Sequence, residues 1–200
     1  MKFWTTFVTT MLVLAFSAMS AHAGQVKYNF SGSTFEEPGK KKSRSIGFTS
    51  SYRGKKTVSF GRNVKPGTIV IKTGERRLYY VLPGGKAIKY GIGVGRQGFT
   101  WRGRKRISRK AEWPDWRPPA RMIAREKKKG RNLPAFMPGG INNPLGARAM
   151  YLGGSIYRIH GTNQASTIGQ AVSSGCIRMR NDEVTDLYKR VRIGALVIVE

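Results

Sequence analysis

Residues that bind metals or carry out acid–base chemistry are scarce in this sequence. Its 200 residues include one cysteine, Cys176, and two histidines, His22 and His160. A single cysteine cannot form a disulfide within the chain, so an exported protein with one thiol either pairs with another chain or uses the thiol in chemistry. One cysteine and a histidine do not complete a zinc site unless carboxylates converge on them. We therefore expect neither a metal nor a cofactor.

Acidic residues are also few. The chain has 10 Asp and Glu against 37 Lys and Arg, and its formal net charge at pH 7 is +27. The excess is concentrated, because 28 of the 37 basic residues lie between Lys40 and Arg131. Such a charge attracts polyanions over long distances and weakens as salt is added. In the cytoplasm it would favour nucleic acid, whereas in an exported protein it favours an anionic envelope surface or simply keeps the protein soluble.

Long hydrophobic runs are absent apart from one at the N-terminus. Met1-Lys2 gives a short positive start, Phe3–Ser17 is mostly apolar, and Ala21-His22-Ala23 offers the small residues that signal peptidase accepts. The run is too short and too rich in threonine for a good membrane span. We interpret residues 1–23 as a cleaved signal peptide, with a retained anchor as the alternative. This places the protein in the periplasm or cell envelope, with no transmembrane span after cleavage.

The rest of the chain divides in two by composition. Ser, Gly, Lys and Arg dominate residues 24–66, with too few apolar side chains to bury a core, and we predict a poorly structured basic arm there. Residues 67–200 have the strand patterns and turns of one folded domain. The candidate strands of this domain cover residues 68–71, 77–82, 87–94, 149–152, 157–160 and 195–199.

One helix is well signalled, late in the chain. Its apolar stripe has helical spacing and consists of Val184, Leu187, Tyr188 and Val191. Asn181 or Asp182 can cap its start, and Gly194 ends it. The stretch before the later strands, residues 99–148, is rich in Pro, Gly and basic residues, and we predict a long irregular loop there.

Three glycines alternate at the end of the third candidate strand. Gly91, Gly93 and Gly95 share one face of a strand, so another segment must approach that face closely. Gly93 to Gly98 also matches the glycine spacing of a dinucleotide-binding loop. No helix start follows it, so we reject that interpretation.

Small residues lead into the only cysteine. In Ser173-Ser174-Gly175-Cys176, the glycine permits backbone angles that a Cβ forbids, so the chain can turn sharply and expose the sulfur. Such a turn can aim the amides of Gly175 and Cys176 at one point, where they would form an oxyanion hole for a tetrahedral intermediate. The alternative is that Cys176 is a small buried hydrophobic residue, as lone cysteines often are.

His160 is the candidate base for this thiol. A cysteine has a reference pKa of about 8.5 and needs a partner to act as a nucleophile near neutral pH. His160 lies 16 residues before Cys176 and is the only imidazole outside the predicted signal peptide. No Asp or Glu lies within residues 160–181 to orient the ring. The orienting group is therefore either a backbone carbonyl, such as that of Gly161, or the hydroxyl of Ser173.

The sequence around these two residues resembles a known family. The segments Ile159-His160-Gly161-Thr162-Asn163 and Ser173-Ser174-Gly175-Cys176-Ile177-Arg178-Met179, followed by Asn181, are similar to the bacterial L,D-transpeptidase catalytic domain. The resemblance also includes Met137–Gly140, Asn143–Ala149 and Val191–Glu200, and covers roughly residues 67–200. Many family members carry a histidine before the motif glycine, where this chain has Ser174.

The resemblance implies both a fold and a reaction. The fold is mostly β, an L,D-transpeptidase-type β-sandwich of mixed sheets with one late helix. Cys176 attacks the carbonyl of the third residue of a peptidoglycan stem, releases the terminal D-alanine and holds a thioester until an amine takes the acyl group. His160 removes the thiol proton and later helps the amine. Arg178, Ser174 and Asn163 are the candidate substrate-binding residues.

Arg178 has two possible roles. It lies two residues after Cys176, so in an extended segment it shares that face of the chain. There its guanidinium could hold a stem-peptide carboxylate in a bidentate pair. A structural ion pair with Asp182 or Asp186 is equally compatible with the sequence.

Several functions remain open at this stage. The same thioester can pass to another stem peptide to form a 3-3 cross-link, to the amine of an envelope protein, or to water, as in an L,D-carboxypeptidase. A sortase-like transpeptidase would have a Thr-rich approach to the cysteine and a distant Arg, and neither is evident. The non-enzymatic alternative is a basic envelope-binding protein with an inert Cys–His pair. No specific nucleic-acid partner is expected.

Overall fold

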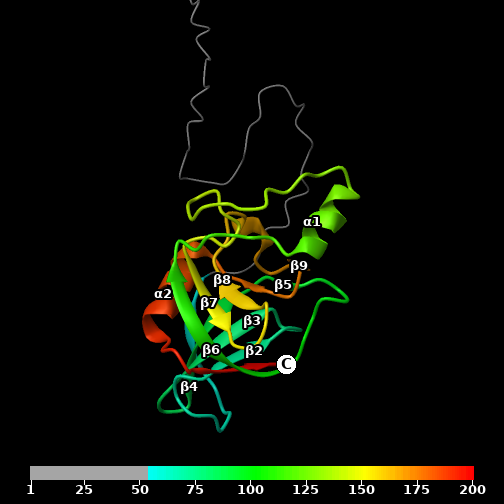
Figure 1. Cartoon of the computed structure of the whole chain (residues 1–200). Coiled ribbons are helices and arrows are strands. Elements are labelled where there is room, and N and C mark those ends of the chain that lie inside the picture. The colour runs from blue at the N-terminus through cyan, green and yellow to red at the C-terminus, as the bar shows by residue number, and fades with distance from the viewer. Residues whose placement is uncertain (1–53) are drawn as a thin grey trace, which may run out of the picture. The chain divides into compact units, whose positions relative to one another are not determined.

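The structure is a computed structural model that describes residues 54–200 (Figure 1). The predicted signal peptide and residues 24–53 of the predicted arm lie outside the described residues. The described part is mainly strands. These are β1 (Lys56–Ser59), β2 (Ile69–Lys72), β3 (Arg77–Leu82), β4 (Lys86–Gly91), β5 (Val94–Gly95), β6 (Gly103–Glu112), β7 (Arg148–Leu152), β8 (Arg158–His160), β9 (Ala171–Ser173), β10 (Ile177–Arg178) and β11 (Leu196–Val199). The helices are α1 (Ala120–Lys127), α2 (Asn181–Arg190) and a 3₁₀ turn, Ala165–Thr167.

The strands form a mixed sheet that folds over a core. Its order is β1-β4-β3-β2-β11-β6-β7-β8-β10, and β5 and β9 form a separate pair. β11 runs parallel to β2, and β10 parallel to β8, while the other pairs in the large sheet are antiparallel. The first half of β6 pairs with β11 and the second half with β7, with a register shift between Ile107 and Arg109. β6 thus joins the two layers, and the predicted β-sandwich of mixed sheets is confirmed.

The main core lies between these layers and α2. Alternate residues of the strands point into it, including Ile69 and Ile71 of β2 and Leu78 of β3, all fully buried. A smaller cluster on the other side of β2 and β11 contains Val70 and Ile198. Strand residues therefore bury both faces here, which explains the continuous apolar runs in the sequence.

The late helix is confirmed, but both ends differ from the prediction, and it ends at Arg190, four residues before Gly194. Val184, Leu187 and Val191 pack into the core, as their spacing predicts. The residue before the helix is Arg180, and no side chain caps the N-terminus. The amide side chain of Asn181 has other partners, in the candidate active site.

The predicted loop at residues 99–148 is more ordered than the sequence suggests. It contains the ten-residue strand β6 and the short helix α1. In β6 only Ile107 is buried, so the strand has no apolar alternation to reveal it. In α1 no residue is buried, and neither end of it carries a capping side chain.

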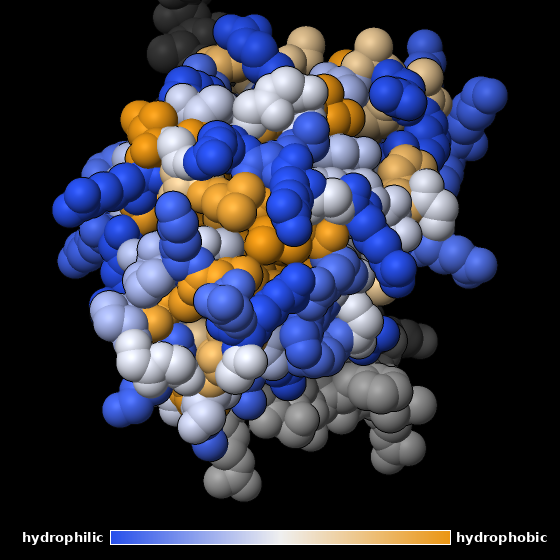
Figure 2. All heavy atoms as spheres, turned by 90° about the horizontal axis from the view of Figure 1, so that it is seen from below, coloured by the Kyte–Doolittle hydropathy of each residue, from blue (hydrophilic) through white to orange (hydrophobic). Residues whose placement is uncertain are grey.

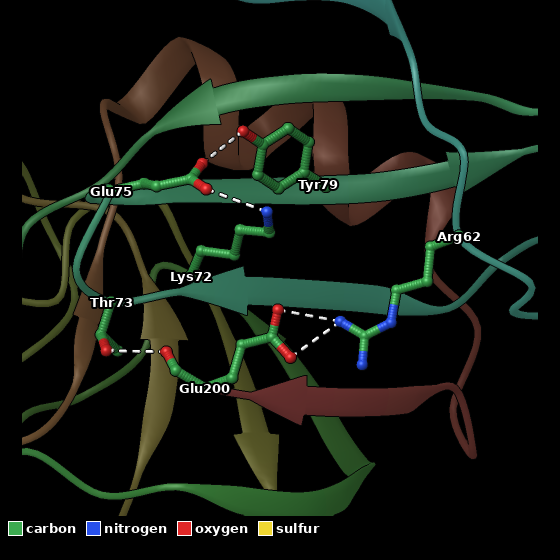
Figure 3. Close-up of polar contacts among 6 residues, drawn as sticks. All are labelled: Arg62, Lys72, Thr73, Glu75, Tyr79 and Glu200. Carbon is green, nitrogen blue, oxygen red and sulfur yellow. Dashed lines mark hydrogen bonds and ion pairs between the residues drawn. The ribbon is translucent and has the colours of Figure 1, made fainter.

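The predicted boundary between arm and domain, at residue 66, lies too late in the chain. Residues 56–59 form β1, which pairs with β4 in the sheet. Phe60 is buried and stacks on Tyr79, with ring centroids 5.1 Å apart. Figure 3 shows Arg62 holding both carboxylate oxygens of Glu200 at 2.8 Å. Backbone pairing and these contacts order residues 54–66, although few of their side chains are apolar.

Within residues 54–200, no helix is long and apolar enough to cross a membrane.

Candidate active site

Neighbouring parallel strands bring the predicted catalytic residues to one region. β8 ends at His160, and β10 begins directly after Cys176. The register sets Ile177 opposite Ile159 and Arg178 opposite His160. Residues 16 apart in sequence thus lie on adjacent strands, as the predicted return loop requires.

The turn before Cys176 depends on Gly175. This residue has φ +105°, in the region that favours glycine, and a Cβ there would stand 2.5 Å from the Tyr157 ring. The carbonyl of Gly175 accepts a hydrogen bond from the Trp101 indole at 3.0 Å, and Trp101 stacks on Tyr157 with centroids 4.8 Å apart. Two aromatic side chains therefore support the turn from behind. No local sequence pattern predicted a role for either of them.

Of the two amides predicted to form the oxyanion hole, the amide of Gly175 is already hydrogen-bonded within the turn. The amide of Gly175 donates to the hydroxyl of Ser173 at 3.1 Å, and that hydroxyl donates to the carbonyl of Cys176 at 2.6 Å. Ser173 therefore closes the turn on itself and does not orient His160. Among the described residues the amide of Cys176 has no hydrogen-bond partner, so it stays available to an oxyanion.

His160 is buried, and a backbone carbonyl orients it. Its Nδ1 lies 2.6 Å from the carbonyl oxygen of Gly161. Since a carbonyl only accepts hydrogen bonds, Nδ1 carries the proton and Nε2 keeps its lone pair. Burial, assisted by the positive charge of Arg178, lowers the pKa of His160 to about 3, against the effect of the Gly161 carbonyl. The imidazole is thus neutral at physiological pH and can accept a proton.

The thiol of Cys176 is protonated in this arrangement. Burial raises its pKa, although the charge and hydrogen bonding of Arg158 act in the opposite direction. Its Sγ contacts the carbonyl of Ile156 at 3.9 Å. No hydrogen bond joins Sγ to His160 in the part of the chain that the structure describes. Both groups are therefore neutral, and they are not an ion pair.

Two arginines without acidic partners flank the cysteine. The Nε atoms of Arg158 and Arg178 are buried and have no hydrogen-bond partner in the described structure. Burial lowers the pKa of Arg178, and the nearby Cys176 thiolate would raise it. The alternative ion pairs for Arg178 are not formed, because Asp182 pairs with Arg180 and Asp186 with Arg190 and Lys55. The site therefore holds positive charge that the protein itself does not neutralise.

Arg158 was not among the predicted site residues. Strand alternation does place Arg158 with the candidate base. Arg158 and His160 lie two residues apart on a strand whose middle residue, Ile159, is fully buried. The two side chains must then share the face opposite the core. The sequence offered no means of choosing Arg158 from the many other arginines.

One asparagine holds the loops around His160. The Oδ1 of Asn181 accepts hydrogen bonds from the amides of Ala147 (3.0 Å) and Thr162 (3.1 Å). A Cβ on Gly146 or Gly161 would collide with this oxygen. The glycines in the two motifs thus allow Asn181 to approach and fix the backbone on either side of the imidazole.

The remaining predicted residues lie at the edges of the site. Asn163 is exposed, and its amide donates to the carbonyl of Asn142 at 2.8 Å. The hydroxyl of Ser174 accepts a 3.3 Å hydrogen bond from Arg125 of α1, which links the helix to the cysteine turn. Gly93 and Gly95 allow the close approaches expected of them. A Cβ on Gly93 would stand 2.9 Å from the Thr167 carbonyl, and one on Gly95 would collide with the Phe99 carbonyl.

Within residues 54–200, no three His, Cys, Asp or Glu side chains converge in a way that could hold a metal ion.

Sequence comparison identifies the class to which this fold and site belong. The model of the L,D-transpeptidase catalytic domain family matches residues 66–199. The chain therefore belongs to the L,D-transpeptidase family. The probable L,D-transpeptidases ErfK/SrfK and YcfS of Escherichia coli K12 are 41% and 42% identical to it over 134 and 135 residues. Each match covers 64% of this chain and 42% of the relative, so the chain aligns with less than half the length of either relative.

Solved structures show the same fold. An L,D-transpeptidase from Mycobacterium smegmatis has a TM-score of 0.53 at 19% identity, covering 66% of this chain and 58% of its own. A Brucella melitensis protein described as a probable carnitine operon oxidoreductase is 46% identical, with a TM-score of 0.50, covering 74% and 93%. An oxidoreductase that uses a dinucleotide needs a loop to bind it. In this chain Gly93 to Gly98 is not such a loop, because β6 follows it and not a helix.

Proposed function

We propose that the protein is an exported L,D-transpeptidase that acts on peptidoglycan tetrapeptide stems through a thioester on Cys176. The observation that carries the proposal is the set of groups at the ends of β8 and β10. A thiol, a neutral imidazole and two partly buried arginines without acidic partners lie there. A nucleophile, a base and an anion-binding group are what acyl transfer from a carboxylate-bearing peptide needs.

The first step is removal of the thiol proton. The Sγ of Cys176 turns from the Ile156 carbonyl toward the imidazole by rotation about the Cα–Cβ bond. The Nε2 lone pair of His160 then accepts the proton. Catalytic hydrogen bonds are often longer in a free enzyme and tighten when substrate binds.

The thiolate then attacks the carbonyl of the third stem residue. A carbon–sulfur bond forms, and the negative charge on the carbonyl oxygen is met by the free amide of Cys176. When the intermediate collapses, the bond to the terminal D-alanine breaks, and the proton on His160 passes to the leaving amine. The neutral imidazole is regenerated and the acyl group remains on sulfur.

An acceptor completes the reaction. Its nucleophile gives a proton to His160 and takes the acyl group from Cys176, which recovers its thiol. The acceptor can be a stem-peptide amine, giving a 3-3 cross-link, the amine of an envelope protein, or water. The three reactions differ only in the acceptor that enters the site, and the products of the assay below distinguish them.

Arg178 and Arg158 supply the binding energy for the donor. A guanidinium holds a carboxylate by two parallel hydrogen bonds, and burial strengthens such a pair. In the free protein these groups lack a counter-charge, so a donor carboxylate gains attraction that no internal acid competes for. Ser174 and Asn163 lie at the border of the same region and complete the proposed substrate contacts.

The proposed location follows from the substrate. Residues 1–23 are proposed as a signal peptide that delivers the enzyme to the periplasm or cell envelope, where stem peptides are found. Residues 24–53 are proposed as a basic arm that contributes to attraction toward anionic envelope material.

The test uses purified protein and a disaccharide-tetrapeptide, with products resolved by mass. We expect loss of D-alanine together with a dimer or a tripeptide product. Cys176→Ala should abolish turnover without unfolding the protein, since one small side chain replaces another. Ser59→Ala is the control, because it alters an exposed residue of β1, outside the site, and keeps the thiol. Turnover by Cys176→Ala would disprove the thioester mechanism.

A further inference from the structure

A hollow that does not include Cys176 lies where β2 and β11 begin and α2 ends. Its volume is about 920 Å³, which falls within the range of small-molecule sites. No residue of the candidate active site lines it. Residues 63–68 line it, together with residues at the start of β11 and just before it. The proposed reaction gives this hollow no role.

The floor of the hollow is apolar. Leu196 and Ile198 of β11 line it, together with Val64 from the segment before β2. These residues pack with the smaller core cluster, so their positions are fixed by the fold. Figure 2 views the molecule from the side on which β11 lies in Figure 1, and it shows apolar surface in a hollow bordered by hydrophilic side chains.

Arginines of β6 stand directly beside this floor. The register pairs Arg104 with Ile198 and Arg106 with Leu196. Paired residues on antiparallel strands present their side chains to the same face of the sheet. The two guanidinium groups therefore border the apolar strip, and Arg106 is held there by a 2.9 Å hydrogen bond to the carbonyl of Gly194.

The border carries positive charge with little compensation. Lys65, Arg190 and Arg192 line the hollow in addition to the two arginines of β6, and no acidic residue lines it. Arg190 is paired with Asp186. Among the described residues, Lys65, Arg104, Arg106 and Arg192 form no ion pair. Four cations thus surround one apolar floor without a carboxylate.

We infer that this hollow binds an anionic lipid, with its phosphate among the arginines and the start of its acyl chains on the apolar floor. A guanidinium matches the geometry of phosphate oxygens, and Arg is less strongly hydrated than Lys. A simple inorganic anion would leave the apolar floor unused. The chain's own N-terminal part does not suit the hollow, because residues 1–53 contain seven Lys and Arg against two Glu.

Three soluble probes separate the contributions of charge and chain. The full chain is titrated with dihexanoyl-phosphatidylglycerol below its micelle concentration, while the methyl NMR signals of Leu196 and Ile198 are followed. Dihexanoyl-phosphatidylcholine has the same chains without net charge, and glycerol phosphate has the anion without chains. We expect saturable shifts with phosphatidylglycerol and at least about tenfold weaker binding of the other two, since each loses one of two contacts worth more than about 1.4 kcal/mol.

A matched pair of variants tests the assignment to the hollow. Arg104→Gln/Arg192→Gln removes two exposed cations from its border, and Arg121→Gln/Lys127→Gln removes two exposed cations from α1. We expect about tenfold or greater loss of phosphatidylglycerol binding in the first and at most about twofold in the second. Equal losses would overturn the proposal in favour of general charge attraction. Equally tight glycerol phosphate binding would mean a plain anion site, and absent shifts at Leu196 and Ile198 would mean no site.

Discussion

Two arginines beside Cys176 are the most informative residues of the site. A buried Nε without a hydrogen-bond partner costs stability, which is consistent with a function that the free protein does not display. Arg158 and Arg178 differ in their relation to the thiol. Arg158 is the stronger influence on the pKa of Cys176, while Arg178 faces His160 across the two strands. Their roles should therefore separate in experiment.

Arg178→Lys is expected to lower turnover without altering thiol reactivity. Lysine keeps the charge near Cys176 but loses the planar two-donor fork. Loss of one charged hydrogen bond is worth about 1.5–3 kcal/mol, so kcat/KM should fall about 10-fold or more. Alkylation of Cys176 by a small neutral reagent should stay near wild type. Thermal stability should not fall, because Arg178 takes part in no ion pair among the described residues.

Arg180→Lys is the control for this variant. Arg180 is exposed and paired with Asp182, so turnover should be nearly unchanged. In contrast, Arg158→Ala should slow alkylation as well as turnover, since the charge and hydrogen bond of Arg158 lower the pKa of the thiol. If alkylation and turnover fell together in Arg178→Lys, Arg178 would shape the thiol and would not be a substrate contact.

Burial of His160 should make stability depend on pH. Its pKa is lowered to about 3 in the folded protein, against about 6.5 in an unfolded chain. Below pH 6.5 the unfolded state takes up a proton that the folded state excludes, so this contribution to stability is complete above pH 6.5 and is lost as pH falls toward 3. The slope from this group is about 1.4 kcal/mol per pH unit.

The measurement compares the free energy of unfolding of wild type and His160→Gln between pH 4.5 and 7.5. Gln does not titrate, and the remaining groups are common to both proteins. We expect the difference between them to shrink as the pH is lowered. A difference that stays constant across this range would show that the imidazole protonates normally in the folded protein, which would contradict a neutral buried base.

Among the strands, those with buried apolar residues could be predicted from the sequence, and the strand without them could not. β2, β3, β7 and β11 bury alternate or continuous apolar residues, and the sequence predicts each to within about a residue. The sequence did not predict β6, because half of its residues have long cationic side chains that pack on neighbouring groups. Lys110 donates to the carbonyls of Tyr188 and Val191 and lies 4.1 Å from the Tyr188 ring centre. A lysine that packs by its methylenes looks like solvent-exposed sequence.

The site shows the same division. Residue type and spacing predicted the pair Cys176 and His160, and left the Gly161 carbonyl and the Ser173 hydroxyl as alternatives for orienting the imidazole; the Gly161 carbonyl is the one in contact with it. The support of the turn by Trp101 and Tyr157 could not be predicted, because those side chains are 75 and 19 residues from Cys176 and meet it only in the folded chain. The assignment of the Gly175 amide failed for a local reason, since the hydroxyl of Ser173 reaches it first.

The start of the folded domain can be tested by two truncations. Removing residues 24–53 should leave thermal stability nearly unchanged if the ordered domain begins at β1. Removing residues 24–66 deletes β1, the buried Phe60 and the Arg62–Glu200 pair. Loss of a buried aromatic side chain alone costs about 3–5 kcal/mol. We expect a large fall in the melting temperature only for the longer deletion.

Circular dichroism and differential scanning fluorimetry can measure both truncations alongside Phe60→Ala in the full chain. That variant should account for much of the loss seen in the longer deletion. Equal stability of both truncated proteins would mean that β1 pairs with β4 without supporting the domain.

On the scale of the whole molecule, positive charge belongs mainly to the folded domain. Residues 54–200 carry 30 of the 37 Lys and Arg and eight of the ten acidic residues. At least nine of these 30 cations form ion pairs, and others lie beside Cys176 or line the apolar hollow. The field that attracts anionic material is therefore expected to originate from the domain surface more than from residues 24–53.

Salt dependence of binding to isolated peptidoglycan sacculi tests this distribution. Residues 24–53 hold six Lys and Arg and two Glu, a net charge of +4. Since the Debye length falls from about 10 Å at 0.1 M salt to about 3 Å at 1 M, binding of the full protein should weaken steeply over that range. Deletion of residues 24–53 should retain most of this dependence. The quadruple variant Arg121→Gln/Lys127→Gln/Lys128→Gln/Lys129→Gln removes the same net charge from the domain and should have a comparable small effect. If the deletion abolished the salt dependence and the quadruple variant left it intact, residues 24–53 would be a dedicated binding segment, and the domain surface would not be the source of the attraction.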